Sequence, residues 1–247
     1  MIVAIDGPAG SGKTTAAKRL AQKLNIGYLD TGATYRALTL KALEEGVDLS
    51  DSRSLEGLAK NLDIRLEKDK TFLEGRDVSR AIRTPRINHN ISQIVGHPRV
   101  REVMVALQRK IAENKDFVVE GRDITTVVFP KADFKFYLDA DFSVRVTRRH
   151  KEFKQKQIEA DLDLVEKDLK KRDSADMNRE AGPLRVAKDA ICIDTTNLSI
   201  EEVVEELAGY VKRKISKSCS VTRFVSALGK SILFSTGIIF KLLSRAR

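Results

Sequence analysis

The chain has 247 residues, 42% of them hydrophobic and 32% charged, which is typical of a globular protein with one large domain. Tryptophan is absent and aromatic residues make up only 6% of the chain, so the stacking platforms that bind single-stranded nucleic acid are not expected. The net charge of +10 would favour nucleic acid, but nine cations and no carboxylates lie between Ala208 and Arg247, so the rest of the chain is close to neutral.

The N-terminal part of the chain alternates between strand and helix patterns. The short apolar run Met1–Ile5 contains β-branched residues and stops at Asp6-Gly7-Pro8, which predicts a buried parallel strand. A helix is predicted over Lys13–Leu24, followed by a strand at Tyr28–Asp30 and a helix from about Ala33 to Leu43. This alternation predicts an α/β fold with a parallel sheet.

The turn after the first strand carries a phosphate-binding motif. Gly7-Pro8-Ala9-Gly10-Ser11-Gly12-Lys13-Thr14 matches the pattern G-x-x-x-x-G-K-[ST] between a predicted strand and a predicted helix, the context that this motif requires. Glycines let backbone N–H groups turn toward phosphate oxygens, and the helix adds its positive end. We expect Lys13 to reach the β- and γ-phosphates of a bound nucleotide, Thr14 to ligate Mg²⁺ and Thr15 to complete the site.

The phosphate motif alone does not identify the acceptor. A GTPase would need an Asn/Thr-Lys-x-Asp element to read its base, but Asn114-Lys115 is followed directly by Asp116. A motor ATPase would usually show an apolar strand that ends in Asp-Glu, and this sequence has none. A kinase that acts on a small molecule is therefore favoured.

Three later apolar runs bring the predicted sheet to about five strands. They lie at Phe117–Val119, Phe134–Leu138 and Ala190–Ile193, and an acidic residue follows each run. Open α/β sheets bind ligands at the carboxyl ends of their strands, so functional side chains are expected there. Cys192 lies within the last run and is expected to be a core residue.

Two segments depart from the alternation of strands and helices. Within about residues 49–97, Ile64–Leu66 and Thr71–Leu73 predict a small hairpin in an inserted segment. Leu162–Lys171 predicts a charged helix that leads into the octet Arg172–Arg179. The octet carries both signs of charge and is expected to be too polar to bury.

Four segments resemble those of bacterial-type cytidylate kinases. Asp30–Arg36 is similar to their D-[ST]-G-A-x-Y-R segment, and Glu120–Pro130 is similar to G-R-D-x-G-T-V-V-F-P, except that Thr125 replaces a glycine. The other two similarities are Ser92-Gln93 with Pro98–Glu102, which match S-Q-x-x-x-x-P-x-V-R, and Arg172–Arg179, which keeps the R-D-x-x-D-x-x-R pattern of the lid.

The resemblance runs from about Ile2 to Lys214 and implies a fold and an activity. The fold is a P-loop nucleoside monophosphate kinase-like α/β fold of three layers, with a central parallel sheet of about five strands. A catalytic domain over residues 1–214 contains a nucleotide-binding insert at about 49–97 and a short lid at about 172–185. The implied reaction transfers the γ-phosphate of ATP to CMP or dCMP with Mg²⁺, in a monomer. A cytoplasmic location is expected because the N-terminus shows no signal-sequence pattern, and the composition and charge distribution favour a protein that binds no nucleic acid.

Candidate substrate contacts come from these same segments. The dianionic phosphate of an acceptor nucleotide suits guanidinium groups, for which Arg36, Arg122 and Arg179 are candidates. Cytosine has an N4 donor and acceptors at O2 and N3, which Asp123, Arg101 and Ser92 fit. The resemblance implies these base-reading roles, and it adds ribose contacts from Asp176 and Arg172 and a place near the acceptor phosphate for Thr31. Substrate contacts are also expected from Tyr35 and Gly121, and catalytic contacts from Lys13, Arg122, Arg172 and Arg179.

Other interpretations of these residues stay open. Arg101 could form a salt bridge on a helix surface, and the lid residues Arg172, Asp176 and Arg179 could pair among themselves when no substrate is bound. Asp6 could cap the phosphate loop without taking part in chemistry. The rival functions are a kinase for UMP or shikimate, and a basic nucleic-acid-binding protein that uses the C-terminal segment.

The basic extension over residues 215–247 continues past the resemblance. Apolar residues such as Phe224 and Leu228 recur at helical spacing among cations, which suits contact with an anionic membrane surface. The apolar runs are too short to span a bilayer. Alternatives are a helix that packs on the domain or on a partner protein, and a disordered segment. The stretch also resembles the opening of a membrane-bound acyltransferase.

Overall fold

The computed structural model describes residues 1–67, 70–155, 159, 161–214 and 216. Residues Met1–Val204 form one compact unit, and Glu205–Arg247 form a second. Of the second unit, the structure describes the helical residues 205–214 and Ser216. The predictions for the basic extension therefore lie outside the described residues, apart from Ser216.

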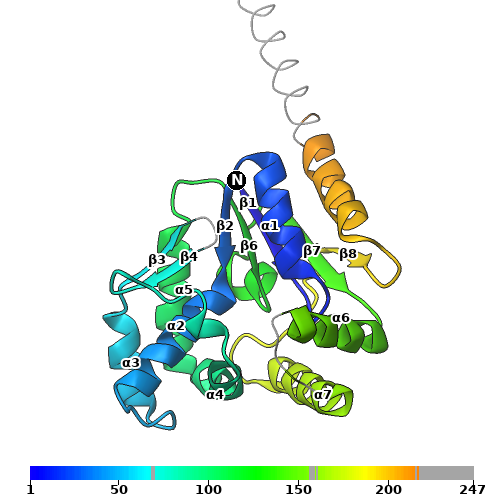
Figure 1. Cartoon of the computed structure of the whole chain (residues 1–247). Helices are drawn as coiled ribbons and strands as arrows, with labels where there is room; N and C mark the ends of the chain where they lie inside the picture. Colours follow the sequence, from blue (N-terminus) through cyan, green and yellow to red (C-terminus); the bar gives the residue numbers. More distant parts are fainter. Residues whose placement is uncertain (68–69, 156–158, 160, 215, 217–247) are drawn as a thin grey trace, which may run out of the picture. The chain divides into compact units, whose positions relative to one another are not determined.

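A five-stranded sheet forms the centre of the first unit (Figure 1). Its strands lie in the order β2-β6-β1-β7-β8, and every neighbouring pair is parallel. The predicted parallel sheet is therefore confirmed. Four strands continue into the acidic or small residues that were predicted to end them. The bounds are β1 (Ile2–Asp6), β2 (Gly27–Asp30), β6 (Phe117–Gly121), β7 (Phe134–Asp139) and β8 (Ile191–Asp194).

One core prediction is wrong, because Cys192 is exposed. The strand that contains it, β8, lies at the edge of the sheet. Successive side chains of a strand point to opposite faces, and here Ile193 is the buried neighbour. The apolar run therefore places a strand correctly but does not show which of its side chains face the core.

The first two helices begin at local signals in the sequence. Helix α1 (Lys13–Leu24) has the predicted bounds, and Asn25 ends it in the left-handed conformation. Helix α2 (Thr31–Glu44) begins two residues earlier than predicted. The reason is that the Asp30 carboxylate accepts a hydrogen bond from the Ala33 N–H at 2.9 Å and so caps the helix.

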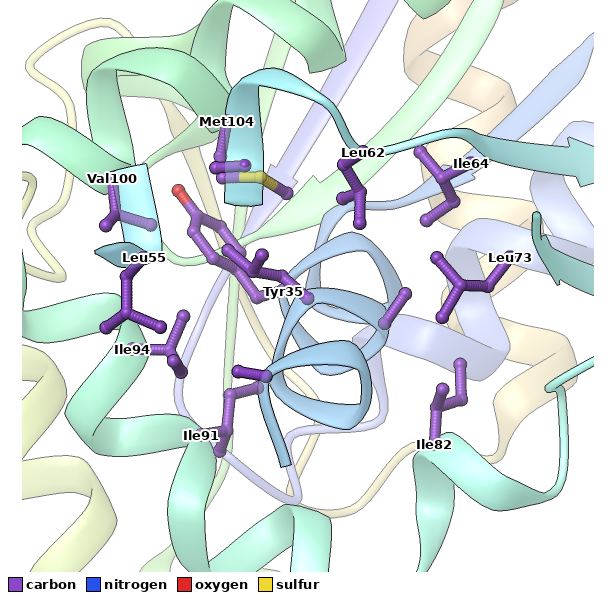
Figure 2. Close-up of a cluster of buried hydrophobic side chains, with 14 of the residues drawn as sticks. Tyr35, Leu55, Leu62, Ile64, Leu73, Ile82, Ile91, Ile94, Val100 and Met104 are labelled. Carbon is purple, nitrogen blue, oxygen red and sulfur yellow. The ribbon is translucent and has the colours of Figure 1, made fainter. Parts of the chain in front are cut away.

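The inserted segment forms its own small sheet and packs on α2. The predicted hairpin is confirmed as β3 and β4, which pair antiparallel, and β5 extends the small sheet. Apolar side chains from this segment, from α2 and from the next helix, α5 (Pro98–Ile111), form one buried cluster that includes Tyr35 and Met104 (Figure 2). The elements of the segment are α3 (Ser52–Lys60), β3 (Ile64–Glu67), β4 (Lys70–Leu73), β5 (Arg76–Asp77), η1 (Ala81–Arg83) and α4 (Pro85–Gly96).

The remaining elements lie around the carboxyl ends of the strands. A short turn of π-helix, η2 (Ile124–Val128), follows β6, and α6 (Phe142–Gln155) follows β7. The predicted charged helix is α7 (Leu162–Asn178), which lies beside α6 (Figure 1). The helix includes most of the octet Arg172–Arg179. The octet was predicted to be too polar to bury, and this prediction is wrong for Asp173 and Asp176, which are buried beside arginine partners.

Among the residues that the structure describes, no helix is both long enough and apolar enough to cross a membrane.

Met104 tests the importance of the cluster in Figure 2 for stability. It is fully buried, and Met104→Ala would leave a cavity, so we expect the free energy of unfolding to fall by about 2–5 kcal/mol. Urea denaturation followed by circular dichroism measures the change. The control Leu164→Ala removes a side chain that is 63% exposed and should change stability by less than about 0.5 kcal/mol. Equal effects of the two substitutions would contradict the assignment of this core.

Candidate functional site

A cavity of about 490 Å³ opens at the carboxyl ends of the central strands. Its wall contains the phosphate loop from Ala9 to Thr15 on one side and residues of α2, α4, α5 and α7 on the other. Most of the sequence-predicted site residues meet here, although they are spread over more than 160 positions of the chain. Those in the wall are Ala9, Gly10, Ser11, Gly12, Lys13, Thr14, Thr15, Thr31, Tyr35, Arg36, Ser92, Arg101, Gly121, Arg122, Asp123, Arg172, Asp176 and Arg179.

The phosphate loop has the backbone shape that an anion site needs. Gly10 and Gly12 have φ angles of 79° and 85°, a region that favours glycine. Helix α1 begins directly after Gly12, with no side-chain cap and no acidic residue in its first turn. Its free N–H groups and positive end are therefore available to phosphate oxygens.

Gly7 and Pro8 shape the loop from outside the cavity wall. A Cβ at Gly7 would overlap the Leu138 carbonyl oxygen of β7, so the close approach of the two backbones requires glycine. The Pro8 carbonyl accepts a hydrogen bond of 2.8 Å from Lys13 Nζ. The two residues thus support the loop and hold its lysine in place.

Glu120, at the end of β6, lies beside the phosphate loop and is the main acidic residue that the sequence analysis missed. Burial, followed by repulsion from Arg122, lowers the pKa of Lys13, and burial likewise raises the pKa of Glu120. Glu120 also accepts a hydrogen bond from the Thr14 hydroxyl. The one sequence feature that could have identified Glu120 as a site residue is its position directly after the apolar run of a predicted strand.

The oxygen atoms of Thr14 and Glu120 fit a magnesium ion that is held mainly by phosphate. Mg²⁺ prefers oxygen ligands and usually takes only one or two from the protein, with phosphates and water completing its shell. In the described part of the chain, no group of three or more His, Cys, Asp or Glu side chains could hold a metal ion. The donor set is thus suited to Mg²⁺ brought by a nucleotide.

A cluster of arginines from distant segments faces the phosphate loop across the cavity. Burial, and then repulsion from Arg122 and Arg36, lowers the pKa of Arg172 to about 9. Burial also lowers the pKa of Arg36. Burial acts in the same direction on Arg122, but its attraction to and hydrogen bond with Asp176, together with the charges of Glu120 and Asp173, outweigh burial and raise its pKa. Three guanidinium groups that repel one another around one cavity form a site for a multiply charged anion.

Two of the predicted base-reading residues, Arg101 and Asp123, form a buried group next to these arginines, whereas the third, Ser92, is exposed. Arg101 donates to the Asp123 carboxylate, and Arg179 Nη2 lies 3.5 Å from the other Asp123 oxygen. The Arg101 guanidinium lies over the Tyr35 ring, 5.6 Å from its centroid. The alternative of a salt bridge on the helix surface is wrong, because both Arg101 and Asp123 are buried.

The segment after α7 folds back over this buried group. Gly182 has a φ angle of 59°, and its carbonyl accepts a hydrogen bond of 2.6 Å from Arg179 Nε. A Cβ at Gly182 would overlap Asp123 and the Arg101 guanidinium. The main chain at Gly182 therefore lies directly against the base-reading pair.

One internal pair expected for the lid is present, between Asp176 and Arg179, but the shorter contact of Asp176 is with Arg122, which lies outside the lid. Asp176 Oδ2 accepts a hydrogen bond of 2.7 Å from Arg122 Nε, and Arg179 Nη1 lies 3.5 Å from Asp176 Oδ1. Burial acts to raise the pKa of Asp176, but the charges of Arg122, Arg172 and Arg179 outweigh it, so the pKa lies below its usual value.

The sequence analysis also missed the far side of the phosphate loop. Arg148 of α6 donates to the Thr195 hydroxyl at 2.9 Å and to the Thr195 carbonyl at 2.5 Å. The Thr195 hydroxyl donates to the Ser11 carbonyl at 3.1 Å. Leu198 and Ile200 add an apolar wall to the cavity. These residues form no motif, so only the fold brings them together.

Asp6 is the last residue of β1, directly before the phosphate loop, and it bonds to the turn that carries Asp123. Its carboxylate accepts hydrogen bonds from the Ile124 N–H at 2.9 Å, from the Thr125 N–H at 2.7 Å and from the Thr125 hydroxyl at 2.6 Å. Burial raises its pKa, and these hydrogen bonds act in the opposite direction. Asp6 thus caps the turn after β6 and not the phosphate loop, and Thr125 contributes its side chain to that cap.

Comparison with known proteins gives one consistent family. Residues 3–213 match the family model described as cytidylate kinase. The chain is 48% identical to a cytidylate kinase of Caldanaerobacter subterraneus subsp. tengcongensis over 211 residues, which are 85% of this chain and 94% of that relative. It is 46% identical to a cytidylate kinase of Fusobacterium nucleatum over 217 residues, which are 88% of this chain and 98% of the relative.

The fold is also found in a solved structure of much lower sequence similarity. The crystal structure of an uncharacterized protein from Eubacterium ventriosum is 14% identical, with a TM-score of 0.50 over 86% of this chain and 98% of that chain. At this identity the likeness concerns the fold alone.

The lowered pKa of Asp176 predicts a pH-dependent contribution to stability. A carboxyl group whose pKa is lower in the folded state stabilises the fold above its unfolded-state pKa, and this contribution is lost as the pH falls through the folded-state value. We expect Asp176→Asn to lower the free energy of unfolding by about 3 kcal/mol at pH 7, because Arg122 loses a buried partner.

The difference between the wild type and Asp176→Asn should shrink below about pH 4, where the carboxyl group of the unfolded chain is itself protonated. Urea denaturation from pH 3 to pH 7 measures it. A difference that stays constant over this range would show that Asp176 does not contribute through its charge.

Proposed function

The chain belongs to the cytidylate kinase family, and from this premise we propose how its cavity carries out the reaction. The protein is an ATP-dependent kinase that transfers the γ-phosphate of ATP to CMP or dCMP and gives ADP and CDP or dCDP. The observation that carries the proposed mechanism is the phosphate loop, which faces three arginines and a buried carboxylate–guanidinium pair across one cavity.

ATP binds on the phosphate-loop side of the cavity. The backbone N–H groups from Gly10 to Thr14 hold its phosphates, and Lys13 reaches the β- and γ-phosphates. Thr15 also lines this side. The adenine base lies against the apolar wall of Leu198 and Ile200, next to Arg148.

CMP binds on the opposite side, with its phosphate toward the loop. Arg36, Arg122 and Arg179 hold the dianionic phosphate, for which paired guanidinium donors are suited. Thr31 and Gly121 line the cavity at the ends of β2 and β6, near the same group. The ribose contacts Asp176 and Arg172.

Asp123 and Arg101 distinguish cytosine from uracil. The Asp123 carboxylate accepts a hydrogen bond from the N4 amino group, and Arg101 donates to the acceptors of the ring. Uracil has a carbonyl oxygen in place of the amino group, so its approach to Asp123 would bring two acceptors together. Ser92 adds a polar contact, and Tyr35 forms the wall of this part of the cavity.

The chain's own residues promote transfer by alignment and by charge. Because a phosphate oxygen of CMP is already a nucleophile, no general base is needed. Lys13, Arg122, Arg172 and Arg179 neutralise the charge that spreads over the transferring group, and the lid excludes water. When Mg²⁺ is bound with ATP, it supplies further charge neutralisation, and Thr14 and Glu120 are the residues that would hold it or its water.

Several finer assignments stay predictions. The family match to residue 213 supports a catalytic domain over residues 1–214. The insert at about 49–97 and the lid at about 172–185 stay predictions. We expect a cytoplasmic monomer that does not bind nucleic acid. Contact of residues 216–247 with a membrane or a partner protein can be tested by liposome co-sedimentation, with the chain ended at Lys214 as the control.

The substrate preference is tested by measuring ADP release with CMP, dCMP, UMP, AMP and shikimate as acceptors. We expect turnover with CMP and dCMP to exceed turnover with UMP, because only cytosine offers an amino group to Asp123. A folded protein that leaves CMP unchanged in the presence of ATP and Mg²⁺ would overturn the proposal.

Lys13→Ala should lower kcat by about a hundredfold or more, because it removes a charge that stabilises the transition state. The matched control is Lys23→Ala, which removes an exposed lysine from the same helix. Circular dichroism should show that both variants are folded. Equal turnover of the two variants would contradict the role of Lys13.

Asp123→Ala should weaken CMP recognition by about 1–3 kcal/mol, measured as the change in kcat/KM, because the N4 amino group loses its acceptor. The kcat/KM for UMP should fall less, so the preference for CMP over UMP should decrease. An equal loss for the two nucleotides would show that Asp123 does not read the base.

A further inference from the structure

Ala9, within the phosphate loop, is held through its backbone by side chains from two different helices. Arg145 of α6 donates from Nη1 to the Ala9 carbonyl at 3.0 Å. Asp173 of α7 accepts a hydrogen bond from the Ala9 N–H at 3.3 Å. Arg145 Nη1 also donates to the other oxygen of Asp173. The three residues therefore form one closed network.

The surroundings of this network are buried and closely packed. Arg145 and Asp173 are only 8% and 7% exposed, and Arg145 Nε donates to the Ala140 carbonyl at 3.1 Å. An apolar cluster surrounds the same loop residue: Ala9, Val146, Val165 and Leu169. Both polar and apolar contacts thus join the loop to α6 and α7.

The network lies behind the cavity and not in it. Neither Arg145 nor Asp173 is among the described residues that line the cavity. Asp173 is, however, the direct neighbour of Arg172 and lies three residues before Asp176 on the same helix. Both of those residues line the cavity. Any movement of α7 along or around its own axis that displaces Asp173 therefore also moves two substrate-facing side chains.

A buried ion pair is by itself weak evidence for a gain in stability, because desolvation offsets much of the attraction. This pair differs in that both partners also bond to the backbone of one phosphate-loop residue. Such an arrangement fixes a geometry, since the hydrogen bonds are satisfied in only one position of α7 relative to Ala9. Transfer in line between two bound nucleotides depends on that kind of alignment.

We propose that Arg145 and Asp173 are positioning residues that hold the lid helix α7 in register with the phosphate loop. They place Arg172 and Asp176 relative to the phosphates of ATP, and so couple the donor side of the cavity to the acceptor side. This inference rests on the proposed roles of Arg172 and Asp176 in the kinase reaction.

Asp173→Asn tests the inference with a side chain of nearly the same shape. It can still accept from Ala9 but loses the charge that pairs with Arg145. We expect kcat per folded molecule to fall at least tenfold, because a small misplacement of aligned groups costs up to about a hundredfold. The Kd for CMP without ATP should change less than kcat, because Arg36, Arg101 and Asp123 come from other elements and only the contacts of the ribose with Arg172 and Asp176 depend on α7. The ratio of ATP hydrolysis to CDP formation should rise, because the lid is less well aligned.

Glu166→Gln is the matched control on the same helix. Glu166 pairs with Lys170 at 2.8 Å on an exposed surface of α7, so this variant should keep the kinetics of the wild type. Urea denaturation gives the folded fraction of each variant, to which kcat is normalised. If Asp173→Asn does not fold, Arg145→Lys gives the same readouts, because it keeps a positive charge beside Asp173 but cannot reach Ala9 and Ala140 together.

A double-mutant cycle of Arg145→Lys and Asp173→Asn decides whether the two residues act together. One shared network predicts that the double variant loses no more kcat than the worse single variant. Additive losses, or a normalised kcat equal to that of the wild type, would overturn the inference. A wild type that does not phosphorylate CMP would instead overturn the proposed function, so the two failures are distinguishable.

Discussion

The constraint on which this structure depends is the burial of several positive charges around one cavity. Lys13, Arg36, Arg122 and Arg172 converge there, while three carboxylates of the wall balance only part of their charge: Asp30, Glu120 and Asp176. Burial of unbalanced charge is costly, and the lowered pKa values of Lys13, Arg36 and Arg172 express that cost. Binding of an anionic ligand offsets this cost by balancing the positive charge. The site is therefore suited to bind phosphate groups.

The order of the strands allows these charges to converge. Parallel pairing sets Asp6 opposite Gly121 and Asp30 opposite Glu120, so the segments that follow β1, β2 and β6 begin at neighbouring points of one edge. The phosphate loop, the start of α2 and the turn that carries Asp123 therefore face the same space. Asp6 strengthens this arrangement, because it is in β1 and bonds to the turn after β6.

Local sequence signals were sufficient to predict the sheet, α1 and the phosphate loop, because hydrophobic periodicity and helix-ending residues determine structure over short distances along the chain. Resemblance located the residues of the acceptor side, and the structure brings these into one cavity. Other features were not predictable, because they arise from pairing between distant segments: the Arg145–Asp173 pair, the contact of Arg148 with Thr195 and the burial of Asp176. Cys192 was misplaced because an apolar run does not reveal which face of an edge strand is covered.

Gly182 places a piece of main chain, not a side chain, against the Arg101–Asp123 pair. The space beside the Arg101–Asp123 pair is consequently limited by the path of the chain between α7 and Leu184. The Leu184 N–H donates to the Asp176 carbonyl at 2.8 Å. Exposed lid positions such as Met177 can change their side chains without altering this space. Any larger residue at position 182 would meet both an unfavourable φ angle and a steric overlap. Sequence drift in the lid is thus tolerated on its outer surface but restricted at Gly182, in addition to the lid residues that face the cavity.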